Sequence, residues 1–149
     1  MNVVTCENDA RLSAQAAALV IAEIERRPDL LLCAATGNSP TGLYRALAER
    51  AKQDPVRFRS LRVIALDEWG GLRETDSGST TGYLREHLLG PLAISPDRFI
   101  AFDTTAEPAL ACRKMRDALE RSGPIDVCVL GLGANGHVGF NEPGPTLGS

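Results

Sequence analysis

The sequence predicts an α/β protein in which helices cover both faces of a parallel sheet. Three short, continuous apolar runs, at residues 30–35, 61–66 and 125–131, are typical of strands that are buried on both faces. Segments with helical periodicity separate these runs, and alternating strands and helices favour a parallel sheet. With 149 residues, of which 44% are hydrophobic, the chain fits one domain with its own core.

The helical segments carry apolar residues at positions i, i+3, i+4 and i+7. The first helix is expected over residues 9–27, with Asp9 as its N-cap and an apolar stripe that includes Val20 and Ile24. Pro28 follows and ends it. The remaining elements are expected at residues 40–52, 83–89 and 107–122 for helices and at residues 99–102 for a short strand.

The composition argues against several classes of partner. The formal net charge is −3 and no segment is densely basic, so neither nucleic acid nor an anionic membrane is an expected partner. No stretch approaches the roughly 18 apolar residues of a membrane span, and no basic region followed by an apolar run opens the chain. Of the four cysteines, Cys33 and Cys128 fall inside apolar runs, where we expect buried thiols in a reducing cytoplasm.

Polar, glycine-containing clusters follow all three apolar runs. We call them the first cluster (residues 36–42), the second cluster (residues 67–71) and the third cluster (residues 131–144). In an open parallel sheet, ligands bind beyond the carboxyl ends of the strands. The sequence therefore predicts that the three clusters line one crevice.

The first cluster, TGNSPTG, opens a predicted helix. Backbone N–H groups and the helix dipole favour an anion at such a position, and the hydroxyls of Thr36, Ser39 and Thr41 can add donors. A nucleotide P-loop is excluded because the GK[ST] ending is absent. A phosphate site and a plain turn capped by Ser39 both stay open.

The second cluster begins with Asp67 and Glu68, at the end of a predicted strand. A partly desolvated carboxylate at this position can act as a base near neutral pH. Adjacent side chains of an extended segment point in opposite directions, so we expect only one of the two to face the crevice. A turn or helix-cap pair is the alternative.

The third cluster carries the most specific signal. Its glycines let the backbone approach a ligand closely, and His137 can exchange a proton at neutral pH. Glu142 is close enough to orient this histidine, and Asn135 and Asn141 can hydrogen-bond sugar hydroxyls. The spacing does not match a dinucleotide site, and one histidine with one glutamate offers too few ligands for a metal. A structural role for His137 is the alternative.

Three segments, ATGNSPT at 35–41, LDEW at 66–69 and GLGANGHVGFNEPG at 131–144, resemble the glucosamine-6-phosphate deaminase/galactosamine-6-phosphate isomerase family in order and spacing. The DEW and NGH forms look closest to the galactosamine-6-phosphate branch. The related 6-phosphogluconolactonases share the fold but lack the FNEPG ending. The resemblance implies a three-layer α/β/α, Rossmann-like parallel sheet.

The resemblance also implies roles for the matching residues. Asp67 would move a proton between C2 and C1 of the opened sugar, and the amino group would leave as ammonia from a C2 imine. His137, supported by Glu142 and Asn135, would protonate the ring oxygen. No cofactor would be needed, because the carbonyl and amine of the substrate supply the electron sink. The residues expected at the phosphate are Thr36, Gly37, Asn38 and Ser39.

Two departures from the family pattern matter. Asn135 stands where the glucosamine branch usually has an aspartate, and an amide has no charge with which to support His137 as a proton relay. This favours a galactosamine or ketose phosphate over glucosamine 6-phosphate. Family members are also longer, so we expect residues 1–149 to be the N-terminal portion of one larger domain, with further strands and basic phosphate ligands after Ser149.

The sequence thus predicts an amino-sugar-phosphate isomerase/deaminase acting on galactosamine or glucosamine 6-phosphate, with no metal and no cofactor. A 6-phosphogluconolactonase, in which His137 helps water to attack an ester, is one alternative; the position of Asp67 and the FNEPG ending argue against it. A non-catalytic sugar-phosphate sensor is another, disfavoured by the lack of a helix-turn-helix pattern or basic segment in the chain. The preferred sugar, allosteric activation and the oligomeric state, a homo-oligomer included, are left open.

Overall fold

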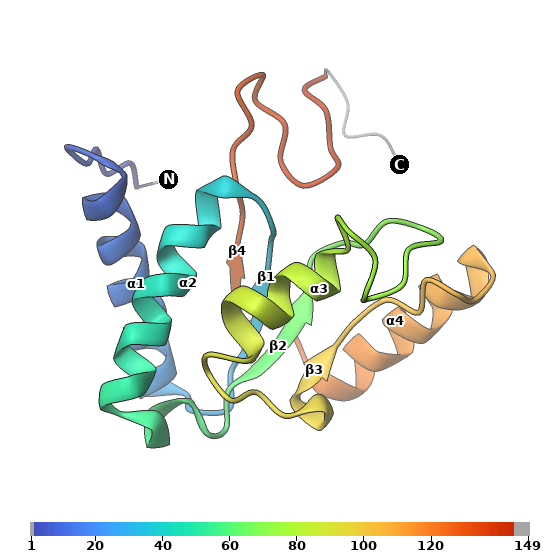
Figure 1. Ribbon diagram of the computed structural model, residues 1–149, viewed down its shortest axis with the longest axis horizontal. Helices are drawn as coiled ribbons and strands as arrows, with labels where there is room; N and C mark the ends of the chain where they lie inside the picture. The colour runs from blue at the N-terminus through green and yellow to red at the C-terminus, as the bar shows by residue number, and fades with distance from the viewer. Residues whose placement is uncertain (1, 145–149) are drawn as a thin grey trace.

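The computed structural model describes residues 2–144 and contains one parallel sheet with helices on both faces (Figure 1). Residues 1 and 145–149 lie outside the described residues. The helices are α1 (Asp9–Arg26), α2 (Asn38–Gln53), α3 (Thr80–Leu84) and α4 (Pro108–Ser122). The strands are β1 (Leu31–Ala34), β2 (Arg62–Ala65), β3 (Phe99–Ile100) and β4 (Val127–Val129). Between residues 2 and 144, no helix is both long and apolar enough to cross a membrane.

The strand order β3-β2-β1-β4 places β1 in the interior of the sheet, and all neighbouring strands run parallel. Cys33 of β1 pairs with Ile64 of β2 on one side and with Cys128 of β4 on the other. The chain moves outward from β1 to β3 and then returns to the opposite side of β1 as β4. The strand order therefore reverses between β1 and β4, which is where open α/β sheets form their ligand crevice.

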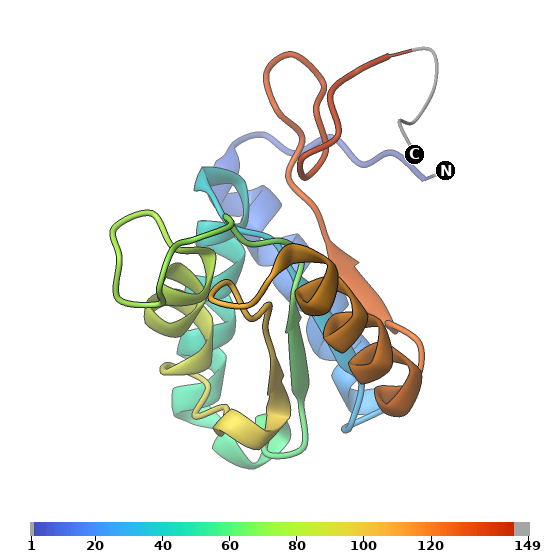
Figure 2. The ribbon, with the colours of Figure 1, turned by 90° about the vertical axis from the view of Figure 1, so that its right-hand side faces the viewer.

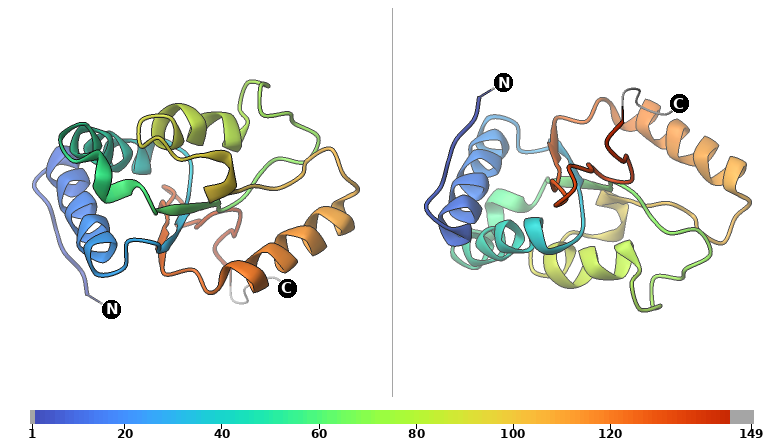
Figure 3. Two further views of the ribbon diagram at one scale, coloured as in Figure 1. Left: turned by 90° about the horizontal axis from the view of Figure 1, so that it is seen from below. Right: turned by 90° about the horizontal axis from the view of Figure 1, so that it is seen from above.

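The two faces of the sheet contact different helices (Figures 2 and 3). Leu32 and Val63 belong to the larger core, which they form with α1, α2 and the helical segment that starts at α3. Leu31 and Ile64 point the other way and pack with Met115 of α4. This alternation of side chains confirms the three-layer α/β/α arrangement predicted from the sequence.

The helix boundaries differ from the predicted ones mainly at the N-termini, and α3 begins at Thr80 rather than at residue 83. Helix α1 starts after Asn8, whose side-chain oxygen accepts a hydrogen bond from the N–H of Arg11 at 2.9 Å, so the assignment of Asp9 as N-cap was wrong. Helix α2 starts at Asn38 with Gly37 as its N-cap, two residues before the predicted start. Ser39 is therefore a residue of the first helical turn rather than a cap.

Strand β4 is shorter and more exposed than predicted. It covers Val127–Val129, and Leu130 directly after it is 50% exposed. Cys128 is exposed, whereas Cys33 beside it is buried as expected. The residues of α4 that face the sheet pack on β1, β2 and the segment that continues β3, and not on β4. Because β4 also lies at the edge of the described sheet, the expectation of a fully buried third strand was wrong.

The exit of β1 into the first cluster is fixed by a buried tyrosine of α2. Tyr44 has no exposed surface, and its hydroxyl donates a hydrogen bond to the carbonyl oxygen of Ala35 at 2.6 Å. Ala35 is itself buried and directly precedes Thr36. The bond therefore satisfies a buried carbonyl at the point where the chain leaves the sheet.

We expect Tyr44→Phe to lower the free energy of unfolding by about 1–3 kcal/mol, because it leaves the buried carbonyl of Ala35 without its donor. Urea denaturation of the wild type and the variant measures this difference. Leu19→Ala, which truncates an exposed side chain of α1, is the control and should change the stability by about 0.5 kcal/mol or less. Equal stabilities of Tyr44→Phe and the wild type would contradict the proposed anchoring.

Candidate active site

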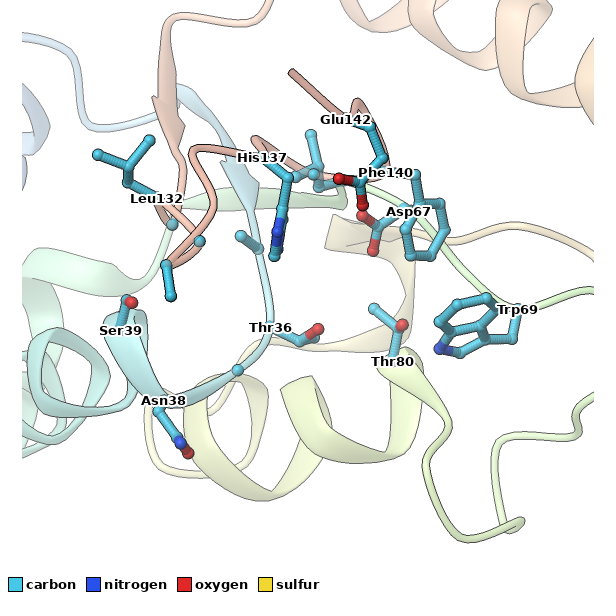
Figure 4. A pocket seen from close by; sticks show the side chains of 17 residues that line it. Thr36, Asn38, Ser39, Asp67, Trp69, Thr80, Leu132, His137, Phe140 and Glu142 are labelled. Atoms are coloured by element: carbon cyan, nitrogen blue, oxygen red, sulfur yellow. The ribbon is translucent and has the colours of Figure 1, made fainter. Parts of the chain in front are cut away.

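The three polar clusters line one cavity of about 830 Å³ at the carboxyl edge of the sheet (Figure 4). This confirms their predicted convergence, which follows from the reversal of strand order beside β1. Residues from the first cluster that line the cavity are Thr36, Gly37, Asn38 and Ser39. Residues from the other two clusters that line it include Asp67, Trp69, Gly133, His137, Phe140 and Glu142.

The first cluster forms the start of α2, and all four residues expected at a phosphate border the cavity. In Figure 4 the side chain of Asn38 points away from His137 and Asp67, so this residue can offer its backbone rather than its amide. Thr41, a predicted hydroxyl donor, is not part of the lining, and its hydroxyl donates instead to the carbonyl oxygen of Gly37 at 2.8 Å.

The described lining of the cavity contains no lysine and no arginine. Within residues 2–144, an anion bound beside the first cluster therefore depends on backbone N–H groups, on the hydroxyls of Thr36 and Ser39, and on the dipole of α2. Over the same residues, no three side chains of histidine, cysteine, aspartate or glutamate lie together in a way that could hold a metal ion.

Of the two adjacent carboxylates in the second cluster, only that of Asp67 lines the cavity, as expected for neighbouring side chains of an extended segment. Glu68 points instead to the start of α3. Its carboxylate accepts hydrogen bonds from the backbone N–H groups of Thr80 and Thr81, both at 2.8 Å, and from that of Trp69 at 3.0 Å. The hydroxyl of Ser79 donates a fourth hydrogen bond at 3.1 Å. Glu68 therefore acts as a clamp between the second cluster and α3.

These surroundings shift the pKa values of Asp67 and Glu68 in opposite directions. Partial burial, together with the nearby charge of Glu68, raises the pKa of Asp67 above its usual value. Partial burial also acts to raise the pKa of Glu68, but the hydrogen bonds from the N–H groups of Thr81, Thr80 and Trp69 outweigh it and lower this pKa overall. At neutral pH the clamp is thus charged, while Asp67 holds its proton more readily than an exposed aspartate does.

Hydrogen bonds in the third cluster connect Glu142 to His137 through Asn135. The amide nitrogen of Asn135 donates to Oε2 of Glu142 at 2.7 Å, and its amide oxygen lies 2.7 Å from Nδ1 of His137. A carboxylate and an amide oxygen only accept, so Nδ1 of His137 carries the proton of this pair. Nε2, on the far side of the ring, is then available for proton exchange. Glu142 therefore reaches the imidazole through Asn135 and not directly.

The backbone of the third cluster lies directly against the imidazole. A Cβ atom at Gly133 would come within 2.2 Å of the His137 ring, so only glycine fits there. The N–H of Gly133 donates to the carbonyl oxygen of His137, and the N–H of Gly136 donates to that of Gly133, both at 2.8 Å. These bonds hold the ring over the cavity, where Figure 4 shows it pointing toward Thr36.

The cavity is also lined by residues to which the sequence assigned no role, among them Thr80, Trp69 and Phe140. Thr80 is buried at the start of α3, next to the clamp. Trp69 and Phe140 pack with their ring centroids 4.6 Å apart. The sequence feature that could have pointed to Trp69 and Phe140 is that each is a single aromatic residue inside an otherwise polar cluster. Their pairing could not be foreseen, because it depends on how the loops after β2 and β4 approach each other.

We expect Glu68→Gln to destabilise the protein by about 2–3 kcal/mol at pH 7, because a neutral amide replaces a charged acceptor of several hydrogen bonds. The folded-state pKa of Glu68 is lowered, so its stabilisation is fully present above the ordinary pKa and is lost as pH falls through the lowered value. The melting temperatures of the two proteins should therefore converge in acid.

Melting temperature measured from pH 7 down to pH 3 tests this expectation. Glu86→Gln, at a glutamate whose side chain is 77% exposed, serves as the matched control and should differ little from the wild type at any pH. A constant difference between Glu68→Gln and the wild type across this range would rule out an ionised clamp.

Comparison with known proteins identifies the family. The family model described as glucosamine-6-phosphate isomerases/6-phosphogluconolactonase matches residues 7–139. A protein of Escherichia coli K12 named AgaI, provisionally assigned as a deaminase, is 37% identical over 141 residues, which are 95% of this chain and 56% of the relative. The glucosamine-6-phosphate deaminase of Bacillus velezensis is 35% identical over 145 residues, covering 97% of this chain and 60% of the relative.

Solved structures agree with this assignment. A monomeric glucosamine-6-phosphate deaminase of the NagB superfamily superposes with a TM-score of 0.91 at 32% identity, covering 98% of this chain and 61% of that one. A 6-phosphogluconolactonase of Thermotoga maritima reaches a TM-score of 0.77 at 19% identity, which shows a shared fold. The chain thus spans roughly 60% of the length of the relatives it matches. It belongs to the glucosamine-6-phosphate isomerase/6-phosphogluconolactonase family.

Proposed function

We propose that the protein carrying this chain is an amino-sugar-phosphate isomerase/deaminase that releases ammonia from glucosamine or galactosamine 6-phosphate. The observation that carries the proposal is the placement of a partly buried carboxylate, Asp67, and an oriented imidazole, His137, on one cavity beside a helix N-terminus. The deaminase relatives that match almost the whole chain support it. Composition leads us to propose the cytoplasm as its location.

In this proposal the phosphate of the substrate lies at the first cluster. Backbone N–H groups at the start of α2 and the hydroxyls of Thr36 and Ser39 face the cavity there, and no acidic residue occupies the first turn of α2 to repel an anion. Placing the phosphate at this end directs the carbon chain of the sugar toward Asp67 and His137.

The proposed reaction uses the two acid–base side chains in sequence. His137, doubly protonated and with Nδ1 bonded to Asn135, protonates the ring oxygen from Nε2. The bond between C1 and the ring oxygen then breaks, and the C1 hydroxyl loses its proton, which returns to Nε2 and leaves the open aldehyde. Asp67 then removes the proton from C2 and returns it to C1, while the C1 oxygen gains a proton and the amino nitrogen loses one, which leaves a hydroxymethyl group at C1 and an imine at C2. Addition of one water to that imine releases ammonia and gives the ketose phosphate. Glu142, which is connected to His137 through Asn135, offsets the positive charge of the imidazole when it is doubly protonated.

We expect Asp67→Asn to reduce turnover of glucosamine 6-phosphate and galactosamine 6-phosphate about 10²–10⁴-fold, since a positioned base contributes about that much. Incorporation of solvent deuterium at C1 of the product measures the proton transfer. His137→Gln should slow cyclic substrates more than an analogue held in the open form. Asp117→Asn, an exposed carboxylate on α4, is the matched control and should retain normal turnover.

Normal deuterium exchange in Asp67→Asn would remove Asp67 as the base. Hydrolysis of 6-phosphogluconolactone by the wild type, without deamination of either amino sugar, would instead assign the protein to the lactonase side of the family. Tight binding of these sugar phosphates with no turnover of any of them would point to a sensor.

The pH dependence of turnover gives a second test of the base. Asp67 acts as a base only when it is ionised, so turnover should rise with pH through the pKa of Asp67. This rise is the acidic limb of the pH–activity profile. Burial together with the charge of Glu68 raises the pKa of Asp67, so the acidic limb should lie above the ordinary value of 3.8. Glu68→Gln removes the neighbouring charge, so we expect its acidic limb to move to lower pH. An unmoved limb would mean that another group controls it.

A further inference from the structure

The reaction proposed above leaves the aromatic pair Trp69–Phe140 without a role, although both rings line the cavity beside Asp67 (Figure 4). Each side chain is 55% exposed, yet the two rings pack on each other at a centroid distance of 4.6 Å and an interplanar angle of 45°. They come from different clusters, one after β2 and one after β4. The pair therefore forms a continuous aromatic wall beside the polar groups of the cavity, which include Asp67 and Thr36.

The backbone on both sides of the wall is fixed. The N–H of Trp69 donates to the Glu68 clamp at 3.0 Å. On the other side, Gly139 has a φ of +60°, and a Cβ atom there would lie 3.8 Å from Oδ2 of Asp67. The segment that carries Phe140 thus crosses directly over the carboxylate.

A hexose phosphate presents two kinds of surface to such a cavity. Its hydroxyls and phosphate need polar partners, whereas the C–H groups along its carbon chain form an apolar face that packs well on an aromatic ring. Inorganic phosphate has the anionic group but no such face. A wall next to Asp67, at the far side of the cavity from the first cluster, is placed to contact the carbon chain and not the phosphate.

We propose that Trp69 and Phe140 are specificity-determining residues, which bind the C–H face of the sugar next to the carbons that Asp67 deprotonates. This inference rests on the proposed function for the identity of the sugar phosphate. The wall selects ligands with an extended carbon chain over small phosphate compounds, and it holds C1 and C2 against the carboxylate.

The test is a binding measurement on the intact protein with two probes, glucosamine 6-phosphate and inorganic phosphate. Trp69 is the only tryptophan of this chain, so the part of the emission that disappears in Trp69→Phe reports the wall directly. We expect glucosamine 6-phosphate to change this emission on saturation and inorganic phosphate to change it little. Calorimetry gives the two dissociation constants independently.

Alanine substitutions in the wall should weaken the binding of glucosamine 6-phosphate much more than that of inorganic phosphate. We expect Trp69→Ala and Phe140→Ala to weaken glucosamine 6-phosphate about 5- to 50-fold, from the lost aromatic contact and apolar area, and to change phosphate binding less than about twofold. Trp69→Phe and Phe140→Tyr keep an aromatic surface and should remain within about threefold of the wild type. Leu19→Ala, an exposed apolar truncation on α1, is the control for nonspecific effects.

Several outcomes would overturn the proposal: equal weakening of both probes by Phe140→Ala, unchanged binding of glucosamine 6-phosphate in both alanine variants, or no emission change with that sugar in the wild type. Steady-state kinetics of the two alanine variants give a second readout. We expect a raised KM with a smaller change in kcat, which a general loss of structure does not produce. A protein that shows the expected binding differences but releases no ammonia would contradict the proposed function and still support the wall.

Discussion

The arrangement of the cavity depends on one carboxylate, that of Glu68. It accepts hydrogen bonds from the backbone N–H groups of Thr80 and Thr81 at the start of α3 and from that of Trp69. These bonds join the segment after β2 to α3. With Glu68 turned to α3, the alternation of the extended chain sends Asp67 to the opposite side, into the cavity. The same clamp sets the position of Trp69 and adds the charge that makes Asp67 easier to protonate. A residue that touches no ligand in the proposed reaction thus orients three features of the site.

The two acid–base side chains are supported by different physical means. Asp67 is held in a partly desolvated position where the backbone of Gly139 passes close to its carboxylate. His137 is held by the chain of hydrogen bonds through Asn135 to Glu142 and by the contact of its ring with Gly133. One group is tuned by burial and the other is oriented by bonding, so that each can be altered with little direct effect on the other. This separation suits a reaction in which ring opening and carbon deprotonation follow one another.

Much of the fold follows from the sequence because β1 and β2 are buried on both faces and therefore read as continuous apolar runs. The same rule misjudged β4, where Cys128 is exposed, since an apolar run does not reveal whether a helix covers it. The meeting of the three clusters was predictable from topology. Pattern alone could show that one of Asp67 and Glu68 faces the cavity, but not which, because the choice depends on the N–H groups of α3. The contact between Trp69 and Phe140 likewise depends on tertiary geometry and has no local signature.

The pairing of β4 with β1 has a consequence for the order of folding. The first two clusters border β1, α2 and β2, which follow one another closely in the chain and can associate early, since short loops cost little entropy to close. The third cluster joins only when β4 reaches β1 from a distant part of the chain, a docking assisted by the hydrogen bond from the N–H of Leu31 to Asp126 at 2.8 Å. We therefore expect the segments that carry Asp67 and the start of α2 to associate before β4 brings His137 to the cavity. The position of His137 therefore depends on a long-range strand pairing, whereas Asp67 lies on a segment whose neighbours are close in the chain.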